Sequence, residues 1–581
     1  MATRYTSLLF SLINVFAPLS AAQAATAPDT AVYAMTGEPA SLDPVYPYDA
    51  SSQGIIFNVY DTLLRFKGSS MTELEPSLST KVPSAQNGLV SADGLTYRFP
   101  IRKNVKFQDG STLEPEDVRY SLLRFMLTDP PGGPAALLLE PVFGLGSTRG
   151  PGGAITLADA DIEKAVRVDG DSVVVKLKRP FAPFLSIVAR WSYVENRKWC
   201  AANGEWDGNL ANWRKYNARP QEKSGLFERM NGTGPFMLER WDRSRKAVHL
   251  AAFPGYWGAK PRITKAVAAT VSEFATRRLM LEAGDADIAD VPHTFASQIR
   301  GLRGVRLDDN LPRIKTDPVF FMTFDINSVG NPDIGSGQLD GRGIPPNFFS
   351  DPDVRKGFSY AFNYEAFLNQ TQAGKGLLAE GPVPPGVPGY AKPKNRYTHD
   401  PAKARGHFMK AFGGKVWRDG FAFTLSYNTG SEGRQASCEI MKREVEALNP
   451  KFHIRLRGID WPVFLEKAQN RKMPMFSRGW IADYPDAHNF VFPFYHSQGR
   501  YASSQGYKNP DMDRLIEQAV AAPAAKRAAL YDRIQQLGYE DAPQVFTVHP
   551  PGIYAYSEKL KGFTDNPVNM GINFLPLYKA P

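Results

Sequence analysis

Residues 93–121 read DGLTYRFPIRKNVKFQDGSTLEPEDVRYS and contain the signals of a strand, a turn and a helix start. Apolar and polar side chains alternate over residues 96–101, which is typical of a strand with one buried face. The Asp-Gly pair at 109–110 is a turn signal. Pro-Glu-Asp at 115–117 favours the first turn of a helix, because proline needs no N–H partner there and acidic side chains interact well with the helix dipole. The stretch therefore predicts strand, turn and helix in this order.

The same alternation of strand-like and helix-like segments continues along the chain. Residues 440–448 and 512–521 have the spacing of amphipathic helices, and residues 55–64 are also helix-like. The pattern predicts an α/β or mixed fold. Two segments rich in Pro and Gly, 129–153 and 331–346, are interpreted as surface loops.

Length and composition set the broad class. The chain has 581 residues, of which 43% are hydrophobic and 22% charged. This is the composition of a globular protein, and the length predicts two or three lobes. The net charge of +10 is not gathered into a run of five or six Lys or Arg residues, so we do not expect nucleic-acid binding. The two cysteines, Cys200 and Cys438, are open to two interpretations, a disulfide or two buried thiols.

The N-terminus has the pattern of a secretory signal peptide. One positive charge in residues 1–4 precedes a mostly apolar run over 8–19, and Ala22-Gln23-Ala24 is a small-x-small cleavage signal. The apolar run is too short to span a membrane. We expect residues 1–24 to be removed and the mature protein to begin at Ala25.

The segment RGWIADYPD at residues 478–486 carries the most suggestive side chain of the chain. It places Asp483 between two aromatic residues, Trp480 and Tyr484, in an otherwise apolar run. A buried carboxylate is costly unless a cation pairs with it, so Asp483 is a candidate anchor for a ligand ammonium group. The alternative is that Asp483 only caps the turn before Pro485.

Five segments together resemble one known family. They are residues 93–121, the 478–486 segment, Gly-Thr-Gly-Pro-Phe at 232–236 with Tyr-Trp-Gly at 256–258 and Gly-Asp-Ala-Asp-Ile at 284–288, residues 353–361 before a Pro-rich loop at 381–389, and Tyr-Lys-Asn-Pro-Asp-Met-Asp at 507–513. In this order they are similar to the extracellular solute-binding proteins of family 5, the receptors of oligopeptide, dipeptide and nickel ABC importers.

The resemblance implies an architecture. It is an α/β type II periplasmic binding protein fold, in which two lobes close on a cleft and a third domain is added. By analogy, lobe I comprises residues 25–70, 231–312 and 542–581. The extra domain would span 71–230, and lobe II would span 313–541.

The resemblance also implies roles for residues of the 478–486 segment. The tryptophan-x-x-aspartate pattern of peptide-binding members falls on Trp480 and Asp483, with Asp483 pairing with the α-ammonium group of a peptide. The main-chain groups of Gly479 and Ile481 would hold the peptide as an added strand. Tyr484 is included in the predicted site. For Gly479, an ordinary turn or bulge glycine is an equal alternative.

Further candidates lie outside this segment. Arg434, which follows the strand-like residues 423–427, is a candidate for the ligand carboxylate, and Asn428 is also included in the predicted binding site. Arg478 is offset by one residue from the arginine expected in oligopeptide receptors, and an offset of one reverses the face of a strand, so we expect a surface role for it. Tyr48 is a candidate for closing over the ligand, with a core aromatic as its alternative.

No catalytic motif or metal-binding spacing is evident, and no cofactor is expected. His488 and His496 are eight residues apart with no third ligand nearby, whereas a metal site needs three or four. We therefore expect a monomeric, non-enzymatic periplasmic receptor of a Gram-negative bacterium. It would deliver a small peptide or peptide-like amine to the permease subunits of an ABC transporter. The alternatives are an opine, sugar or metal chelate as ligand, or a different class, a secreted hydrolase or a binder of unfolded segments.

Overall fold

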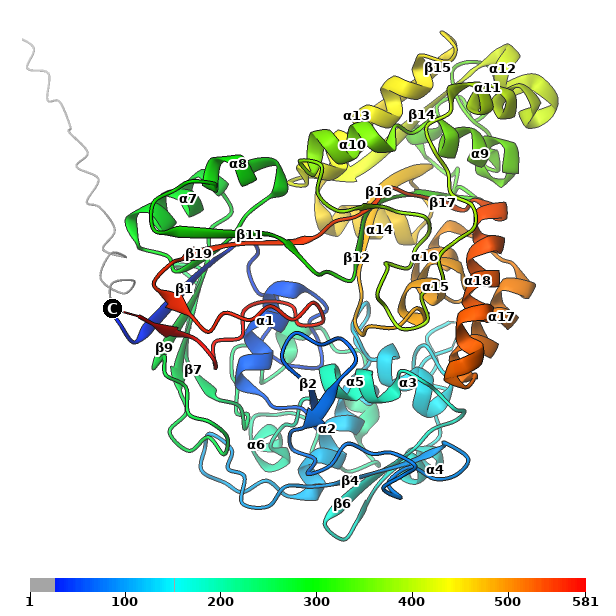
Figure 1. Cartoon of the computed structure of the whole chain (residues 1–581). Coiled ribbons are helices and arrows are strands. Elements are labelled where there is room, and N and C mark those ends of the chain that lie inside the picture. Colours follow the sequence, from blue (N-terminus) through cyan, green and yellow to red (C-terminus); the bar gives the residue numbers. More distant parts are fainter. Residues whose placement is uncertain (1–26, 151, 581) are drawn as a thin grey trace, which may run out of the picture.

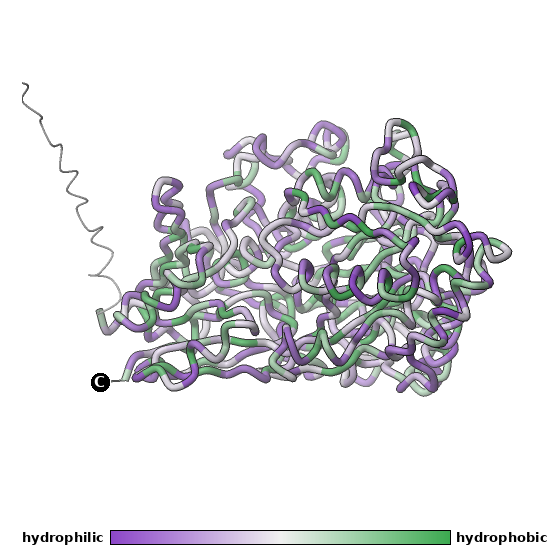
Figure 2. The backbone as a smooth tube through the Cα atoms, turned by 90° about the horizontal axis from the view of Figure 1, so that it is seen from above, coloured by the Kyte–Doolittle hydropathy of each residue, from purple (hydrophilic) through white to green (hydrophobic). Residues whose placement is uncertain are grey.

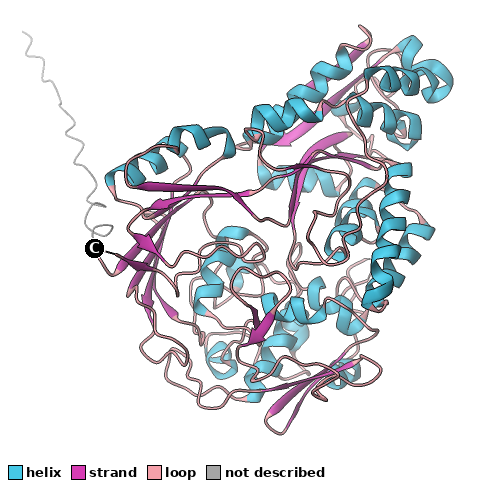
Figure 3. Cartoon of the chain, viewed as in Figure 1, coloured by secondary structure: helices cyan, strands magenta, loops and turns pink. Residues whose placement is uncertain are grey.

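The computed structural model describes residues 27–150 and 152–580. The predicted signal peptide, residues 1–24, lies outside the described residues. Three sheets organise the rest of the chain, each covered by helices (Figures 1 and 3). No helix of the described part is long and apolar enough to cross a membrane.

The first lobe is built on a mixed sheet of seven strands in the order β11-β19-β10-β1-β9-β8-β7. Its strands come from three separated stretches of the chain: β1 (Thr30–Met35), then β7 (Phe236–Asp242), β8 (Ala247–Ala252), β9 (Lys265–Thr270), β10 (Ile288–Asp290) and β11 (Val305–Leu311), and finally β19 (Gly552–Ser557). The helices α1 (Ala50–Val59), α7 (Phe274–Ala283) and α8 (Ala296–Ile299) belong to the same stretches. The fold of this lobe is therefore not contiguous in sequence.

The second lobe contains a five-stranded sheet in the order β15-β14-β16-β12-β17. Its strands are β12 (Lys315–Met322), β14 (Phe421–Asn428), β15 (Phe452–Ile459), β16 (Met475–Ile481) and β17 (Gln544–Phe546). Its helices are α9 (Pro352–Ala361), α10 (Tyr364–Thr371), α11 (Pro401–Lys410), α12 (Lys415–Asp419), α13 (Glu432–Glu446), α14 (Trp461–Gln469), α15 (His488–Tyr495), α16 (Arg500–Gln505), α17 (Pro510–Ala521) and α18 (Ala524–Asp541). The predicted helix at 512–521 is confirmed within α17, and the one at 440–448 corresponds to the end of the longer α13.

Two chain segments connect the two lobes. One runs from the end of β11 at Leu311 to the start of β12 at Lys315, and the other runs from β17 through β18 (Val548–His549) to β19 (Figure 1). β18 pairs with the short β13 (Leu377–Leu378). Within the described residues, the chain thus passes between the two lobes twice.

The third domain has a three-stranded antiparallel sheet of β4 (Thr96–Pro100), β6 (Ser172–Lys176) and β5 (Val166–Asp169). Its helices are α2 (Pro115–Thr128), α3 (Ala136–Phe143), α4 (Asp159–Ala165), α5 (Phe184–Trp191) and α6 (Arg197–Ala202). The strand and helix predicted from residues 93–121 are confirmed as β4 and α2. The main-chain N–H of Glu114 donates to the Asp117 carboxylate at 2.9 Å, which satisfies one donor at the start of α2.

A buried ion cluster ties the third domain to Asp43, in the segment between β1 and α1. Arg124 of α2 is fully buried and contacts Asp43 at 2.6 Å, Glu195 at 2.7 Å and Glu205 at 2.9 Å. Burial raises the pKa of Glu195 to about 8, against the lowering effect of the Arg124 charge. The remaining short strands, β2 (Leu64–Phe66) with β3 (Leu74–Pro76) and β20 (Leu560–Lys561) with β21 (Tyr578–Lys579), form two-stranded pairs.

The predicted helix at 55–64 is displaced in the structure. α1 spans Ala50–Val59, and Leu64 already belongs to β2. The reason is local: Asp49 accepts a hydrogen bond from the main-chain N–H of Ser52 at 2.8 Å and so caps the helix earlier than expected.

The apolar side chains form several separate cores, one of which spans the third domain and the adjoining part of the second lobe. Figure 2 shows hydrophobic residues spread through the whole body of the molecule rather than gathered at one end. Cys200 and Cys438 are both free and buried, in different cores. Of the two interpretations left open, two buried thiols are therefore what the structure contains.

Candidate functional site

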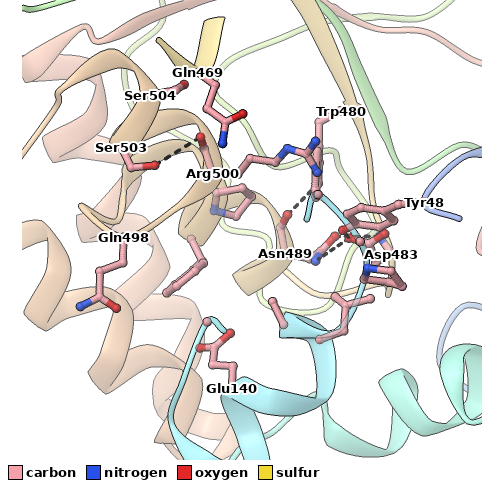
Figure 4. Close-up of a pocket in the computed structure, with 18 of the residues that line it drawn as sticks. Tyr48, Glu140, Gln469, Trp480, Asp483, Asn489, Gln498, Arg500, Ser503 and Ser504 are labelled. Atoms are coloured by element: carbon pink, nitrogen blue, oxygen red, sulfur yellow. Dashed lines mark hydrogen bonds between the residues drawn. The ribbon is translucent and has the colours of Figure 1, made fainter. Parts of the chain in front are cut away.

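A cavity of about 620 Å³ adjoins Asp483 and is lined by residues of all three parts of the molecule (Figure 4). The second lobe contributes most of the wall, from α14, β16, α15 and α16. The third domain contributes residues 131–134 and the start of α3, and Tyr48 comes from the segment that precedes α1. The volume is in the range of sites that enclose small organic ligands.

Asp483 lies just beyond the end of β16 and is 1% exposed. Its carboxylate accepts hydrogen bonds from the Tyr48 hydroxyl at 2.6 Å and from the Asn489 side-chain amide at 3.4 Å, both on Oδ2. The Asp483 main-chain N–H donates to Asn489 Oδ1 at 2.7 Å. Burial raises the pKa of Asp483 to about 6, against the lowering effect of these two hydrogen bonds.

This environment leaves Asp483 without a cation. Among residues 27–150 and 152–580, no Lys, Arg or His approaches its carboxylate within 4.0 Å, and no donor contacts Oδ1. Burial raises the free energy of the ionised carboxyl relative to the protonated one, because the negative charge has lost its water and gained only two hydrogen bonds. An ammonium group placed at Oδ1 would supply the missing opposite charge.

Aromatic side chains surround the Asp483 carboxylate. The Trp480 ring lies edge-on to Tyr48 with centroids 6.5 Å apart and to Tyr501 at 5.7 Å, and its Nε1–H donates to the Asn489 carbonyl at 2.8 Å. Tyr484 is buried and also lines the cavity. The structure thus brings together four of the predicted residues: Tyr48, Trp480, Asp483 and Tyr484.

The third domain also supports the Asp483 turn. Trp191 at the end of α5 donates its Nε1–H to the Asp483 carbonyl at 3.0 Å and lies edge-on to Tyr48. Arg190, which is 2% exposed, stacks over the Trp191 ring at 4.8 Å, and its positive charge lowers the pKa of Asp483. Neither residue was predicted, because nothing in the sequence of α5 distinguishes them from core residues.

Gly479 and Ile481 do not line the cavity. A Cβ at Gly479 would lie 2.3 Å from Cγ of Asp317, so the close neighbour that requires glycine here is the Asp317 side chain. The Gly479 carbonyl accepts a hydrogen bond from the Tyr501 hydroxyl at 3.0 Å. Ile481 is 38% exposed, at the end of β16.

Arg434 and Asn428 lie together but away from the cavity. Arg434 forms a two-pronged ion pair with Asp317, at 3.0 Å from Nε and 3.3 Å from Nη2, and its Nη1 donates to Asn428 Oδ1 at 2.7 Å. The charges of Arg434 and Lys315 outweigh burial and hold the pKa of Asp317 well below its usual range. The Arg434 guanidinium is therefore already neutralised by a carboxylate of the protein.

Arg478 lines the cavity, and the expectation of a surface role for it is wrong. Arg478 and Trp480 are two residues apart on β16, so both side chains point to the same face of the strand, and this face forms a wall of the cavity. Its guanidinium lies 5.0 Å from each of two ring centroids, those of Trp461 and Tyr501.

Two further groups of cavity residues were not predicted. Residues 131–134, within the segment 129–153 interpreted as a surface loop, line the cavity together with residues of the second lobe, which the loop interpretation did not foresee. Arg500, Ser503 and Ser504 come from α16 (Figure 4). The Pro-Gly-Gly-Pro composition at 131–134 was a detectable signal, but nothing in the sequence linked it to residues more than 300 positions away.

The third domain also contacts α15 through a charged pair. Nε2 of His488 lies 3.1 Å from Glu140 Oε1, and Arg179 approaches the same oxygen at 3.4 Å. The contact with His488 lowers the pKa of Glu140 despite its burial. In the part of the chain that the structure describes, no group of three or more His, Cys, Asp or Glu side chains is arranged to hold a metal ion.

The chain resembles known proteins over nearly its whole length. The family model described as bacterial extracellular solute-binding proteins, family 5 middle, matches residues 73–502. A probable D,D-dipeptide-binding periplasmic protein of Escherichia coli is 24% identical over 553 residues, covering 94% of this chain and 93% of that protein.

Two solved structures share the fold. A periplasmic binding protein of Helicobacter pylori in complex with the peptide STSA has a TM-score of 0.74 at 22% identity, covering 95% of this chain and 98% of that one. One from A. tumefaciens in complex with agropinic acid has a TM-score of 0.71 at 22% identity, covering 95% and 99%.

The architecture is that of the type II periplasmic binding proteins, with two lobes, a cleft and an added third domain. The chain belongs to the extracellular solute-binding proteins of family 5. The fold and family predicted from the sequence are thereby confirmed.

Proposed function

We propose that this protein is the periplasmic substrate-binding receptor of an ABC importer and that it binds peptides or peptide-like amines beside Asp483. The observation that carries the proposal is the buried Asp483 carboxylate, which has no cationic partner among the described residues and adjoins the cavity. The E. coli relative is described as a probable D,D-dipeptide-binding protein, and one structural neighbour contains a tetrapeptide.

The α-ammonium group of a peptide fits the needs of Asp483. A charge-assisted hydrogen bond to Oδ1 would contribute about 1.5–3 kcal/mol. It would also remove the penalty of an uncompensated buried charge. Gly479 and Ile481 remain proposed main-chain contacts for the rest of the peptide.

The residues around the Asp483 carboxylate come from both lobes, which suggests how a ligand would favour closure. Tyr48 precedes α1 of the first lobe, whereas Asp483 and Asn489 belong to the second, and their hydrogen bonds meet at one oxygen. A ligand ammonium at the same carboxylate would stabilise the closed arrangement, because it is surrounded only when the lobes approach. The closed form would then dock on the permease subunits, and a partner would hydrolyse ATP.

The test is calorimetric titration with a panel of di-, tri- and tetrapeptides after unfolding and refolding to remove trapped ligand. We expect at least one peptide to bind, and Asp483→Ala to weaken it by two to three decades, the effect of about 3–5 kcal/mol from an unpaired buried charge. Mass spectrometry of recovered peptide should show it intact. Unchanged affinity in Asp483→Ala would contradict the anchor, and cleaved peptide would favour the hydrolase alternative.

A second ligand class is an opine, because a structural neighbour was solved with agropinic acid. Opines are amino acid derivatives, so the two classes overlap in their charged groups. An N-acetylated peptide tests whether binding requires a free α-ammonium group. It keeps the side chains and the carboxylate of the peptide but lacks the ammonium group. We expect acetylation to abolish binding if Asp483 holds an α-ammonium group.

A further inference from the structure

Two arginines on the cavity wall have no carboxylate partner in the described part of the chain. Arg478 of β16 lies between the rings of Trp461 and Tyr501. Arg500, the first residue of α16, lies over the Tyr48 ring at 5.6 Å and points from α16 toward Trp480 and Tyr48 (Figure 4). Neither guanidinium lies within 4.0 Å of any Asp or Glu oxygen of residues 27–150 and 152–580.

The other arginines near this site are paired differently. Arg434 binds Asp317, and Arg527 binds Asp486 at 2.6 Å. Arg471, which also lines the cavity, has Asp325 at 3.2 Å. Among the described arginines that line the cavity, Arg478 and Arg500 are thus the two without a carboxylate partner.

The two free guanidinium groups also repel each other. Burial, with a smaller contribution from the positive charge of Arg500, lowers the pKa of Arg478 to about 10. Aromatic faces stabilise a guanidinium, but they do not neutralise its charge. An anion placed between the two arginines would remove the repulsion and form bidentate hydrogen bonds, for which the planar guanidinium is suited.

The charges around the cavity specify the charge of the ligand. Asp483 contributes one unpaired negative charge, and Arg478 and Arg500 contribute two unpaired positive charges. Glu140, which also lines the cavity, is engaged with His488 and Arg179. A ligand with one ammonium group and two carboxylates would match all three unpaired groups.

Resting on the proposed function, we infer that Arg478 and Arg500 select acidic peptides, in which one carboxylate is the C-terminus and the second belongs to a glutamate or aspartate side chain. If a neutral peptide binds instead, one of the two arginines stays unpaired in the closed cavity. That costs affinity, and a basic side chain would add a third positive charge and cost more.

The test compares peptides that differ only in charge: Ala-Glu with Ala-Gln and Ala-Lys, and Ala-Glu-Ala with Ala-Gln-Ala, by calorimetry in low-salt buffer. A charge-assisted hydrogen bond is about twice as strong as a neutral one, so we expect the glutamate peptide to bind about 10-fold more tightly than its glutamine isostere. Lysine should bind more weakly than glutamine.

Arg500→Gln identifies the source of the preference. Arg500 is exposed, so we expect the variant to fold and to bind Ala-Glu no more tightly than Ala-Gln. Arg514→Gln is the matched control: Arg514 is an exposed arginine of the same lobe, paired with Asp511 on α17, and its loss should leave the preference unchanged.

The outcomes separate the two proposals. Glutamate and glutamine peptides that bind equally well, or a preference for lysine, would overturn the inference and leave peptide binding intact. A preference that survives in Arg500→Gln and Arg478→Gln would also overturn it. Failure of every peptide in the panel, neutral ones included, would overturn the proposed peptide ligand itself.

Discussion

The hydroxyl of Tyr48 donates to Oδ2 of Asp483 at 2.6 Å, although 435 positions separate the two residues in the sequence. The bond joins the segment before α1 to the turn after β16, so it connects the two lobes at the edge of the cavity. Burial and the charge of Asp483 raise the pKa of the Tyr48 hydroxyl well above the usual range. Tyr48 therefore remains a proton donor at every physiological pH.

Tyr48→Phe should weaken ligand binding about 10-fold, since a hydrogen bond to a charged group contributes about 1.5–3 kcal/mol and this one forms across the lobes. Calorimetry with the best-bound peptide measures the effect. The control is Tyr556→Phe, which removes a bond of similar length, 2.7 Å to Asp308, within the first lobe. It should cost stability and leave affinity unchanged; equal losses of affinity in both variants would refute a special role for Tyr48.

Ligand affinity should depend on pH through Asp483. Its raised pKa of about 6 means that the carboxylate, the form that binds an ammonium group, is lost as pH falls through this value. We expect nearly constant affinity from pH 7 to 8 and roughly a 10-fold loss per unit below pH 6. Titrations of Asp483→Asn give the contribution of other groups, including the Glu140–His488 pair, and a wild-type profile parallel to that of Asp483→Asn would contradict this assignment.

The stability of the ligand-free protein should change in the opposite sense. A carboxyl whose pKa is raised in the folded state stabilises the fold below its unfolded value of 3.8, and this contribution is lost as pH rises to about 6. The shift corresponds to about 3 kcal/mol at most. Urea unfolding of Asp483→Asn should therefore show a more stable protein than the wild type at pH 8 and a similar one near pH 4.

Gly479→Ala should destabilise the second lobe, because its Cβ would fall 2.3 Å from Asp317 and displace that carboxylate from Arg434. Overpacking of this kind costs about 1–3 kcal/mol, measurable from urea midpoints. Gly433→Ala on α13 is the control: its Cβ meets nothing within 4 Å, and alanine favours a helix by about 1 kcal/mol. Equal stabilities of the two variants would contradict the packing argument.

Arg434→Gln tests whether this residue acts on the ligand or on the fold. Because Arg434 already pairs with Asp317, we expect a loss of stability of about 3 kcal/mol and a change in peptide affinity below about threefold. Both are measured on the same preparation, by urea unfolding and calorimetry. A loss of affinity above 10-fold in folded protein would restore Arg434 as the binding site for the ligand carboxylate.

The sequence was most informative where the residues of the site are close neighbours in one short segment. Trp480, Asp483 and Tyr484 were found together because they are neighbours in the chain, and residues 93–121 predicted β4 and α2 from local signals alone. Arg434 shows the limit: its partner Asp317 is 117 positions away, and no local pattern signals that ion pair. Arg500 and residues 131–134 were missed for the same reason, since only the folded chain places them beside Asp483.

The position of β19 in the first sheet has a consequence for the order in which the strands can pair during synthesis. In the sheet formed by the described residues, β11 is an edge strand paired with β19, which separates it from β10 and lies some 240 residues later in the chain. At about 5–20 residues per second, β11 waits roughly ten to fifty seconds for its partner while the second lobe is translated. Until β19 is present, the hydrogen-bonding groups of β11 that pair with it stay open, and an open strand edge can pair with another chain.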